Sequence, residues 1–395
     1  MAKTDNLSDF LTDVANSIRT KTGTSDQINA QDFSNKILSI QSESTLKNLI
    51  DATGNAINLF TGYAGTSVDN LIQPNDTSEA VNMTSLFSGC KQLTTVPQLN
   101  TSKAKIMRYI FADCTSLTTI PLLDTSKVTD ISYMFLRCNK ITTLPQLNTS
   151  NVTTITGMFQ DCTSLTAIPQ IDTSKVEWAA DAFNNCSSIT TIPLLDMSNC
   201  KQALRMFYRC KQLTTVPQLN FASATDAGAM FCGCEQLTTV PNLNFTTNRL
   251  VDTAQMFYGC SHLISVELFN TSNVNNMHGM FMDCASLETI PAFDCNSCRI
   301  IYSESGYWLN ESSLSQMFEG CTNLKSILIT NIGSDLNISA STRYERSDLL
   351  VILNNLLPKP EGYPHEINLT MGATNLAKLT EEDKAIATNK GWTLA

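Results

Sequence analysis

The sequence predicts an α/β repeat solenoid of about ten stacked coils, because one pair of residue types recurs at a fixed interval. Cysteines recur in ten units, and the first seven are 24 residues apart: Cys90, Cys114, Cys138, Cys162, Cys186, Cys210, Cys234, Cys260, Cys284 and Cys321. A phenylalanine lies three residues before each of them: Phe87, Phe111, Phe135, Phe159, Phe183, Phe207, Phe231, Phe257, Phe281 and Phe318. Such a period is typical of coils that stack and bury a shared core.

The first part of each unit has helical spacing, which is clearest in residues 124–148. The apolar residues there are Val128, Ile131, Met134, Phe135 and Cys138. We expect a short helix, with the hydroxyl of Thr125 or Ser126 capping its first free N–H groups.

The second part of each unit is expected to be an arc of extended chain. Ile141, Leu144 and Leu147 are apolar at intervals of three, a step that neither a strand nor a helix keeps. We expect a brief strand at residues 142–144, stacked on the same residues of the next coil. The fourteen cysteines should be reduced, and those of the repeat buried, because we expect synthesis in a reducing compartment.

A proline and a polar turn close each unit. The prolines, which lack an N–H and should end the paired segment, are Pro97, Pro121, Pro145, Pro169, Pro193, Pro217, Pro241 and Pro291. Asp124, Asn148 and Asp172, each followed by Thr-Ser, should then turn the chain by accepting backbone hydrogen bonds.

This pattern resembles the BspA-like leucine-rich repeats, whose units carry Met-Phe-x-x-Cys-x-x-Leu followed by an Asp-Thr-Ser turn. The resemblance covers about residues 44–330 and implies a leucine-rich-repeat solenoid. The chain departs from the pattern in its prolines, in Leu86, Ile110 and Ala182 in place of Met, in the turn at 220–223 and in an insertion at 297–313. These departures concern the local path of single coils.

We expect four segments: a helical anchoring segment at 1–42, an N-terminal cap of the array at 43–76, the repeats at 77–330 and an α+β C-terminal cap at 331–395. The cap should hold a helix at 347–357, a strand at 367–372, a further helix and a final strand at Trp392.

The anchoring segment carries one apolar helical stripe, formed by Leu7, Phe10, Leu11, Val14 and Ile18. A hairpin of this size is at the limit of independent folding, so it should dock on a partner. The segment is similar to the N-termini of phage tail or fibre proteins. The resemblance implies attachment to other virion structural proteins.

Composition excludes some classes of partner. The net charge is −10, the isoelectric point is about 4.8, and there is no basic run, which argues against nucleic acid. No apolar stretch reaches the roughly 18 residues of a membrane-spanning helix, and the first residues do not form a secretory signal. We therefore expect neither a membrane anchor nor export by a signal peptide.

Catalysis, metal binding and a cofactor are not expected. The chain has three histidines, His262, His278 and His365, and the repeat cysteines should be buried and unreactive. Cys295 and Cys298 have the spacing of half a zinc site, but a structural zinc needs four ligands, and two thiols in a turn are the simpler interpretation. A redox or metal role for that pair stays open.

Two surfaces are candidates for ligand binding. Stacking should align one hydroxyl row, formed by Thr94, Thr118, Thr142, Thr166, Thr190, Thr214 and Thr238. The row could bind a glycan or a protein, or could be a solvated row with high strand propensity. The insertion at 297–313 carries Tyr302, Tyr307 and Trp308, and insertions in solenoids gather on a binding face.

Three functions fit these features. The first is a phage virion protein, made in the bacterial cytoplasm, whose array binds a glycan or protein of the bacterial surface. Analogy with phage spikes and fibres suggests a trimer. The second is a BspA-like adhesin on the bacterial surface. The third is a structural decoration protein that binds no host. None of the three is an enzyme.

Overall fold

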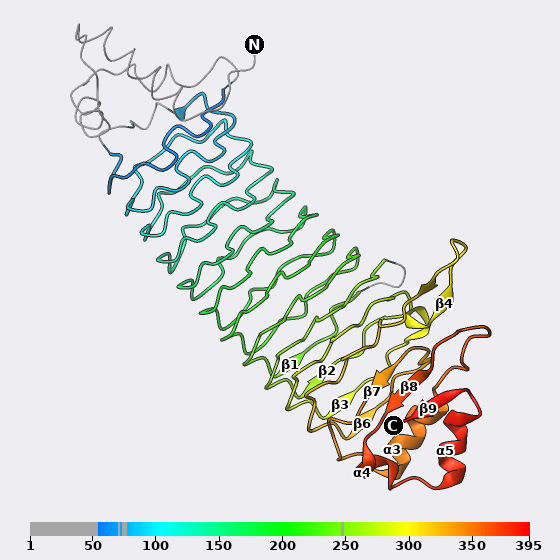
Figure 1. Cartoon of the computed structure of the whole chain (residues 1–395). Coiled ribbons are helices and arrows are strands. Elements are labelled where there is room, and N and C mark those ends of the chain that lie inside the picture. Colours follow the sequence, from blue (N-terminus) through cyan, green and yellow to red (C-terminus); the bar gives the residue numbers. More distant parts are fainter. Residues whose placement is uncertain (1–53, 70–71, 73–76, 246–248) are drawn as a thin grey trace, which may run out of the picture.

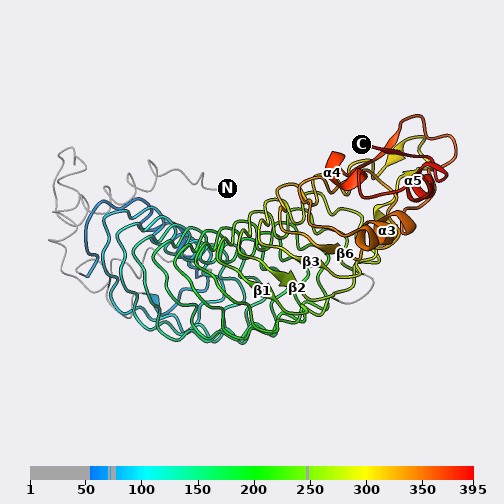
Figure 2. The same cartoon turned by 90° about the horizontal axis from the view of Figure 1, so that it is seen from below.

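The computed structural model describes residues 54–69, 72, 77–245 and 249–395, and in these ranges the chain forms a stack of coils (Figure 1). The stack is long and curved, and it ends in a group of helices at the C-terminus (Figure 2). One hydrophobic cluster runs through it, from Ala56 to Trp392. The expected anchor, residues 1–42, and most of the expected N-terminal cap lie outside the described residues.

The prediction of a helix in the first part of each coil is wrong, because that part of the chain is a series of turns. The N–H groups of Tyr133, Phe135 and Arg137 donate to carbonyls of the next coil at 2.8 to 2.9 Å, while the N–H groups between them bond three residues back. This alternation needs left-handed backbone, with φ of +57° at Tyr133 and +59° at Arg137. An α-helix contains no such residues. The turns place the same residues in the core as a helix would, so the apolar spacing does not distinguish the two.

Thr125 caps no helix but joins two coils. It is buried, and its Oγ1 donates to the carbonyl oxygen of Asn148 in the next coil at 2.8 Å. The corresponding threonines of other coils, Thr77, Thr101 and Thr271, make the same bond. The row of buried threonines therefore holds neighbouring coils together.

The interior is built from two ladders. The phenylalanine rings of successive coils are stacked, with centroids 5.4 to 6.1 Å apart from Phe60 to Phe318. Each repeat cysteine donates its thiol proton to the phenylalanine carbonyl of the preceding coil, as Cys162 does to Phe135 at 3.0 Å. The burial predicted for the ten repeat cysteines is confirmed, and the other four are buried too.

The strand expected at 142–144 is reduced to a single bond, from the N–H of Thr166 to the carbonyl of Thr142 at 3.4 Å. Among the coils that the structure describes, parallel strand pairs appear in the later ones, where β1 (Thr239–Val240) pairs with β2 (Ser265–Val266) and β3 (Thr289–Ile290) pairs with β6 (Ser326–Ile327). In both pairs the second strand is followed by a residue that has an N–H, Glu267 or Leu328, and this N–H donates to the first strand. Elsewhere proline stands at that position, so the expectation that proline ends the pairing is confirmed.

The polar turns expected at the end of each unit are confirmed. Oδ1 of Asp124 accepts hydrogen bonds from the N–H of Ser126 at 3.0 Å and from its hydroxyl at 2.6 Å. Asn148 holds Ser150, and Asp172 holds Ser174, in the same way. We call each of these an Asx turn, a turn closed by an Asp or Asn side chain.

The repeat is interrupted after the short 3-10 helix η2 (Asn296–Cys298) by an antiparallel hairpin. Its strands are β4 (Ile301–Tyr302) and β5 (Trp308–Leu309). Figure 1 shows this hairpin projecting from the stack near its C-terminal end.

The C-terminal region continues the stack with longer elements: β7 (Leu336–Asn337), α3 (Arg346–Asn354), β8 (Ile367–Thr370), α4 (Ala373–Leu376), α5 (Glu381–Thr388) and β9 (Trp392–Leu394). The parallel sheet has the order β7-β8-β9. Arg346 donates two bonds to Asp383 and ties α3 to α5. Elements are found where the sequence predicts the helix at 347–357, the strand at 367–372 and the strand at Trp392. Within the described ranges no helix is long and apolar enough to span a bilayer.

Candidate functional site

The hairpin β4–β5 has two different faces. Ile301 pairs with Leu309 and Tyr302 with Trp308, and successive pairs of a hairpin alternate between its faces. Tyr307, one residue before Trp308, belongs to the face of Ile301 and Leu309. We call these three residues the outer face, and all three are exposed, Tyr307 at 71%.

The other face of the hairpin rests on the C-terminal region. The Trp308 ring is 4.9 Å from the rings of both Tyr302 and Tyr363, edge to face in each case. Tyr363 is buried, and its hydroxyl donates to Oε1 of Glu311 at 3.2 Å. Burial first, and then the bond to Glu311, raise the pKa of Tyr363 to about 12. Trp308 therefore serves mainly as a support, whereas Tyr302 remains 62% exposed.

Polar contacts fix the base of the hairpin. The amide of Asn310 donates to the carbonyls of Ser297 and Arg299 at 3.0 and 3.1 Å, which ties the two ends of the hairpin together. The hydroxyl of Ser313 donates to the carbonyl of Cys298 at 2.6 Å. The outer face is therefore fixed both by the contact of Trp308 with Tyr363 and by the hydrogen bonds of Asn310 and Ser313. This limits the conformational entropy that the hairpin loses when it binds a partner.

Cys295 and Cys298 lie at the two ends of the turn that precedes this hairpin. Both are buried, and burial raises the pKa of the Cys298 thiol to about 12. The Cys298 thiol donates to the carbonyl of Val274 at 3.1 Å. No cluster of three or more potential metal ligands occurs in the part of the chain that the structure describes. The geometry fits two thiols in a packed turn.

The remaining thiols and the histidines are not brought together into a nucleophilic site in the described ranges. Burial raises the thiol pKa throughout the ladder from Cys138 to Cys321, and it raises that of Cys232 to about 11. Nδ1 of His278 contacts the hydroxyl of Ser315 at 2.7 Å, and Nδ1 of His262 contacts the carbonyl of Glu235 at 2.8 Å. A nucleophilic cysteine needs the opposite, a lowered pKa beside a base. Hydrogen bonding to Cys114 does lower the pKa of Cys90, but this thiol is fully buried.

The expected threonine row is aligned along the stack. Six of its seven members are exposed: Thr94, Thr118, Thr142, Thr166, Thr190 and Thr214; Thr238 is half-buried. The hydroxyls of several members donate to the carbonyl of the preceding coil, as Thr118 does to Thr94 at 3.3 Å and Thr214 to Thr190 at 3.2 Å. The donor hydrogens of those hydroxyls are thus already used within the array, which weakens the case for the row as a hydrogen-bond donor to a ligand.

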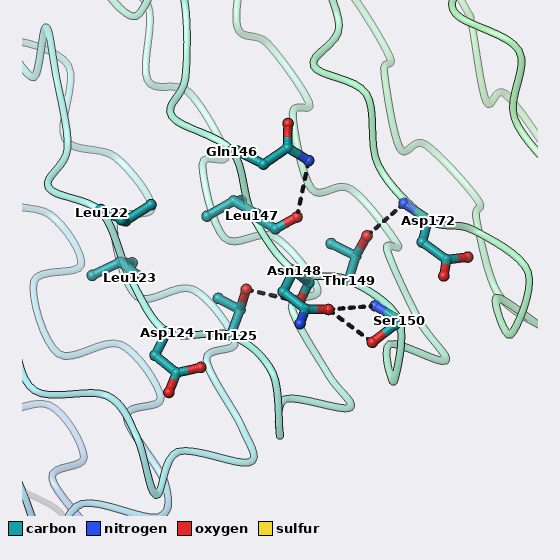
Figure 3. Close-up of a pocket in the computed structure, with 10 residues that line it drawn as sticks. All are labelled: Leu122, Leu123, Asp124, Thr125, Gln146, Leu147, Asn148, Thr149, Ser150 and Asp172. Atoms are coloured by element: carbon teal, nitrogen blue, oxygen red, sulfur yellow. Dashed lines mark hydrogen bonds between the residues drawn. The ribbon is translucent and has the colours of Figure 1, made fainter.

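An open hollow of about 550 Å³ lies beside three consecutive Asx turns, at Asp124, Asn148 and Asp172 (Figure 3). Hydrogen bonds from the hydroxyl and N–H of Ser126 lower the pKa of Asp124, and Ser174 does the same for Asp172. One oxygen of each Asx side chain is therefore occupied in closing its turn. The hollow follows from stacking these turns and is a weaker candidate than the hairpin.

Three residues of the hairpin site are not marked by any feature of the sequence considered above. Ile301 and Leu309 are two of the three residues of its outer face, and Tyr363 is its support. The alternation of a hairpin could have assigned Ile301 and Leu309 had the turn been located. Tyr363 lies far along the chain, and no local pattern marks it.

Comparison with known proteins finds a family model that matches most of the coils. The family model described as "Mycoplasma protein of unknown function, DUF285" matches residues 55–164, 112–220, 137–244 and 225–328. Together these matches span 55–328, more than half of the chain. No curated protein matches the chain.

Three solved structures are among those similar to the chain. A leucine-rich-repeat protein of T. pallidum is 22% identical, covering 40% of this chain and 72% of its own, with a TM-score of 0.32. A leucine-rich cell surface protein of Faecalibacterium prausnitzii A2-165 is 20% identical, covering 73% and 78%, with a TM-score of 0.31. A leucine-rich-repeat protein of Bacteroides ovatus ATCC 8483 is 16% identical, covering 80% and 87%, with a TM-score of 0.23.

Proposed function

This chain belongs to the DUF285 family, whose description carries no function. We therefore propose a function from its own geometry: it is a non-catalytic protein that binds to the surface of bacterial cells. The hairpin β4–β5 is its contact site. The observation that carries the proposal is the outer face, Ile301, Tyr307 and Leu309, which is apolar, exposed and rigidly supported.

The composition of the outer face favours a protein partner. Aromatic residues are enriched in the buried centres of protein interfaces, and charged residues are depleted there. The paired aliphatic side chains of Ile301 and Leu309 offer no hydrogen bonds, which a glycan partner would need at most of its hydroxyl groups. A glycan remains the alternative outcome of the test below.

Binding of the labelled full chain to intact bacterial cells, measured by flow cytometry, tests the proposal. We expect Tyr307→Ser and Ile301→Ser to weaken binding at least about 10-fold each, as loss of a contact worth more than 1.4 kcal/mol would. Ile57→Ser is the matched control, since Ile57 is as exposed as Ile301 but lies in the first described coil. Protease treatment of the cells should abolish binding, whereas periodate treatment should abolish it only if the partner is a glycan. Unchanged binding by both hairpin variants would refute the contact site.

A finer proposal concerns where the protein is displayed. The N-terminal resemblance supports display on a phage particle through residues 1–42, with Leu7, Phe10, Leu11, Val14 and Ile18 as the docking stripe. None of the matches above is a phage protein, and display on the bacterial cell is the alternative. Deletion of residues 1–42 separates the two: loss of incorporation into particles, with cell binding retained, supports the phage.

A further inference from the structure

Eight corresponding segments, placed side by side by the coil stacking, form an unusual surface: 94–98, 118–122, 142–146, 166–170, 190–194, 214–218, 238–242 and 264–268. We call it the strand face, and β1 and β2 lie within it. Its first seven segments contain no charged residue, in a chain that is 16% charged and has a net charge of −10. The one charge of the eighth segment, Glu267, accepts a hydrogen bond from the N–H of Asn242 at 2.9 Å.

The last position of each segment carries either an amide or a leucine, and from the second segment to the eighth their order reads the same in both directions. From Leu122 to Leu268 the order is leucine, two amides, leucine, two amides, leucine. Leu122, Leu194 and Leu268 are 61%, 66% and 50% exposed. Leu194 is the centre of this order, three coils from each of the other two.

We propose that the strand face is an interface between two copies of this chain, related by a twofold axis that passes through Leu194. A twofold interface must be self-complementary, because the same patch meets itself in reverse. Rotation about Leu194 brings Leu122 of one copy onto Leu268 of the other and places Gln170 opposite Gln218. The palindromic order meets this condition, whereas a row selected only for solubility would not need to.

The polar groups of the strand face are prepared for burial. The amides of Gln98, Gln146 and Gln218 donate to carbonyls of the next coil at 2.7 to 2.9 Å, and several threonine hydroxyls donate to the preceding coil. The proline of each of the first seven segments has no N–H at all. Covering a polar surface usually costs free energy because buried donors lose their hydrogen bonds to water. Burying this face would leave few donors without a partner, so that cost is small.

Charge and size set the expected strength. Two copies of a chain with a net charge of −10 repel each other, and an uncharged face is where they can approach at least cost. The paired segments cover roughly 30 by 16 Å, from about 4.8 Å per coil and 3.3 Å per residue. This is below the approximately 800 Å² per partner of a standard interface, so we expect a weak dimer.

Single-cysteine variants of the full chain test both the contact and its symmetry. All fourteen native cysteines are buried, so an engineered surface thiol is the one readily available to an oxidant. Leu194→Cys should form a disulfide-linked dimer with itself, because on the axis the two thiols meet. Leu122→Cys should not link to itself, since its two copies would be about 29 Å apart, against the ~7 Å limit of a disulfide. A mixture of Leu122→Cys and Leu268→Cys should link.

The control is Leu309→Cys on the hairpin, a leucine that is also exposed. Oxidation of Leu194→Cys no faster than that of Leu309→Cys would overturn the proposal, as would self-linking of Leu122→Cys. Sedimentation of the unmodified chain should show a monomer–dimer equilibrium that Leu194→Arg weakens at least 10-fold. A trimer, the assembly suggested by analogy with phage fibres, would also overturn it.

Discussion

The coils of the array bury their core apolar side chains, whereas the hairpin β4–β5 exposes those of its outer face. In the array each phenylalanine of the core ladder has a successor one coil further on, as Phe135 has Phe159 at 5.5 Å, and both are fully buried. In the hairpin, Ile301, Tyr307 and Leu309 have no successors, and they remain exposed. Burial in a solenoid thus comes from repetition, and an interruption of the repeat is where apolar surface becomes available to a partner.

The largest predicted effect is on the cysteines of the array, whose reactivity should differ between the folded and the unfolded protein. All fourteen cysteines are buried, and burial raises the pKa of thiols such as Cys162 to about 12, which disfavours their reactive thiolate form at neutral pH. The pKa of Cys90 is lowered by hydrogen bonding to Cys114, but its burial keeps reagents away from it. We expect an aromatic disulfide reagent to titrate few thiols in the native protein and close to fourteen in denaturant. Several thiols missing from the denatured titration would indicate disulfides and would contradict the reduced ladder.

Replacing a ladder phenylalanine should have the largest effect on the free energy of unfolding. Phe159→Ala removes a fully buried ring from between two neighbours and should cost about 3–5 kcal/mol. The matched change Thr166→Ala, at an exposed position of the next segment of the same coil, should cost less than about 0.5 kcal/mol. Urea unfolding of both variants measures the difference. Equal effects would mean that the inside and outside of the coil are wrongly assigned.

A glycine substitution can distinguish the observed turns from the helix that the sequence suggests. Gly279 has φ +58°, and a Cβ there would meet its nearest neighbour, Cγ of Gln255, at an ordinary 3.5 Å. In a helix Gly279→Ala would stabilise by about 1 kcal/mol, whereas in this left-handed turn it should destabilise by about 1–2 kcal/mol. The sign of the change in urea midpoint decides between them. Ala229→Gly, at φ +51°, tests the same strain in the opposite direction.

The sequence predicts the coil period, the buried Phe and Cys and the Asx turns, because each depends on residues that recur in every unit. It fails on the backbone path of the first part of each coil. Tyr133, Asp181 and Arg205 all occupy left-handed conformations, although none is a glycine. Such strain persists only because hydrogen bonds to the next coil hold it, and those bonds are not visible in one unit.

The candidate site was only partly predictable for a related reason. The break in the repeat marks the insertion, and its aromatic residues are evident from composition. The division into an outer face and a supporting face depends on the register of a short hairpin and on a contact between Trp308 and Tyr363. Neither follows from the repeat, because the insertion occurs once and has no second copy to compare with.

The smallest predicted effect concerns a partly buried carboxylate on the array. Burial raises the pKa of Asp226, and the neighbouring Asp252 adds to the rise, while the N–H of Gly228 donates to Asp226 Oδ1 at 2.9 Å and opposes it. Since the pKa is higher in the folded than in the unfolded state, stability falls as pH rises from the unfolded value, near 3.8, through the folded one, and the loss persists at neutral pH. Asp226→Asn keeps the acceptor for Gly228 but removes the charge.

The Asp226→Asn variant should therefore be more stable than the parent by about 0.5–1 kcal/mol at pH 7, with the gain vanishing near pH 3.5. Urea midpoints at the two pH values measure it. Asp130→Asn is the matched control, because Asp130 lies at the same repeat position four coils earlier but faces Arg108 at 3.5 Å. Asp130→Asn removes an attraction between Asp130 and Arg108, so it should not stabilise the protein at pH 7. If both variants gained equally, the benefit would come from lowering the net charge of the whole chain, and stacked carboxylates in adjacent coils would carry no particular cost.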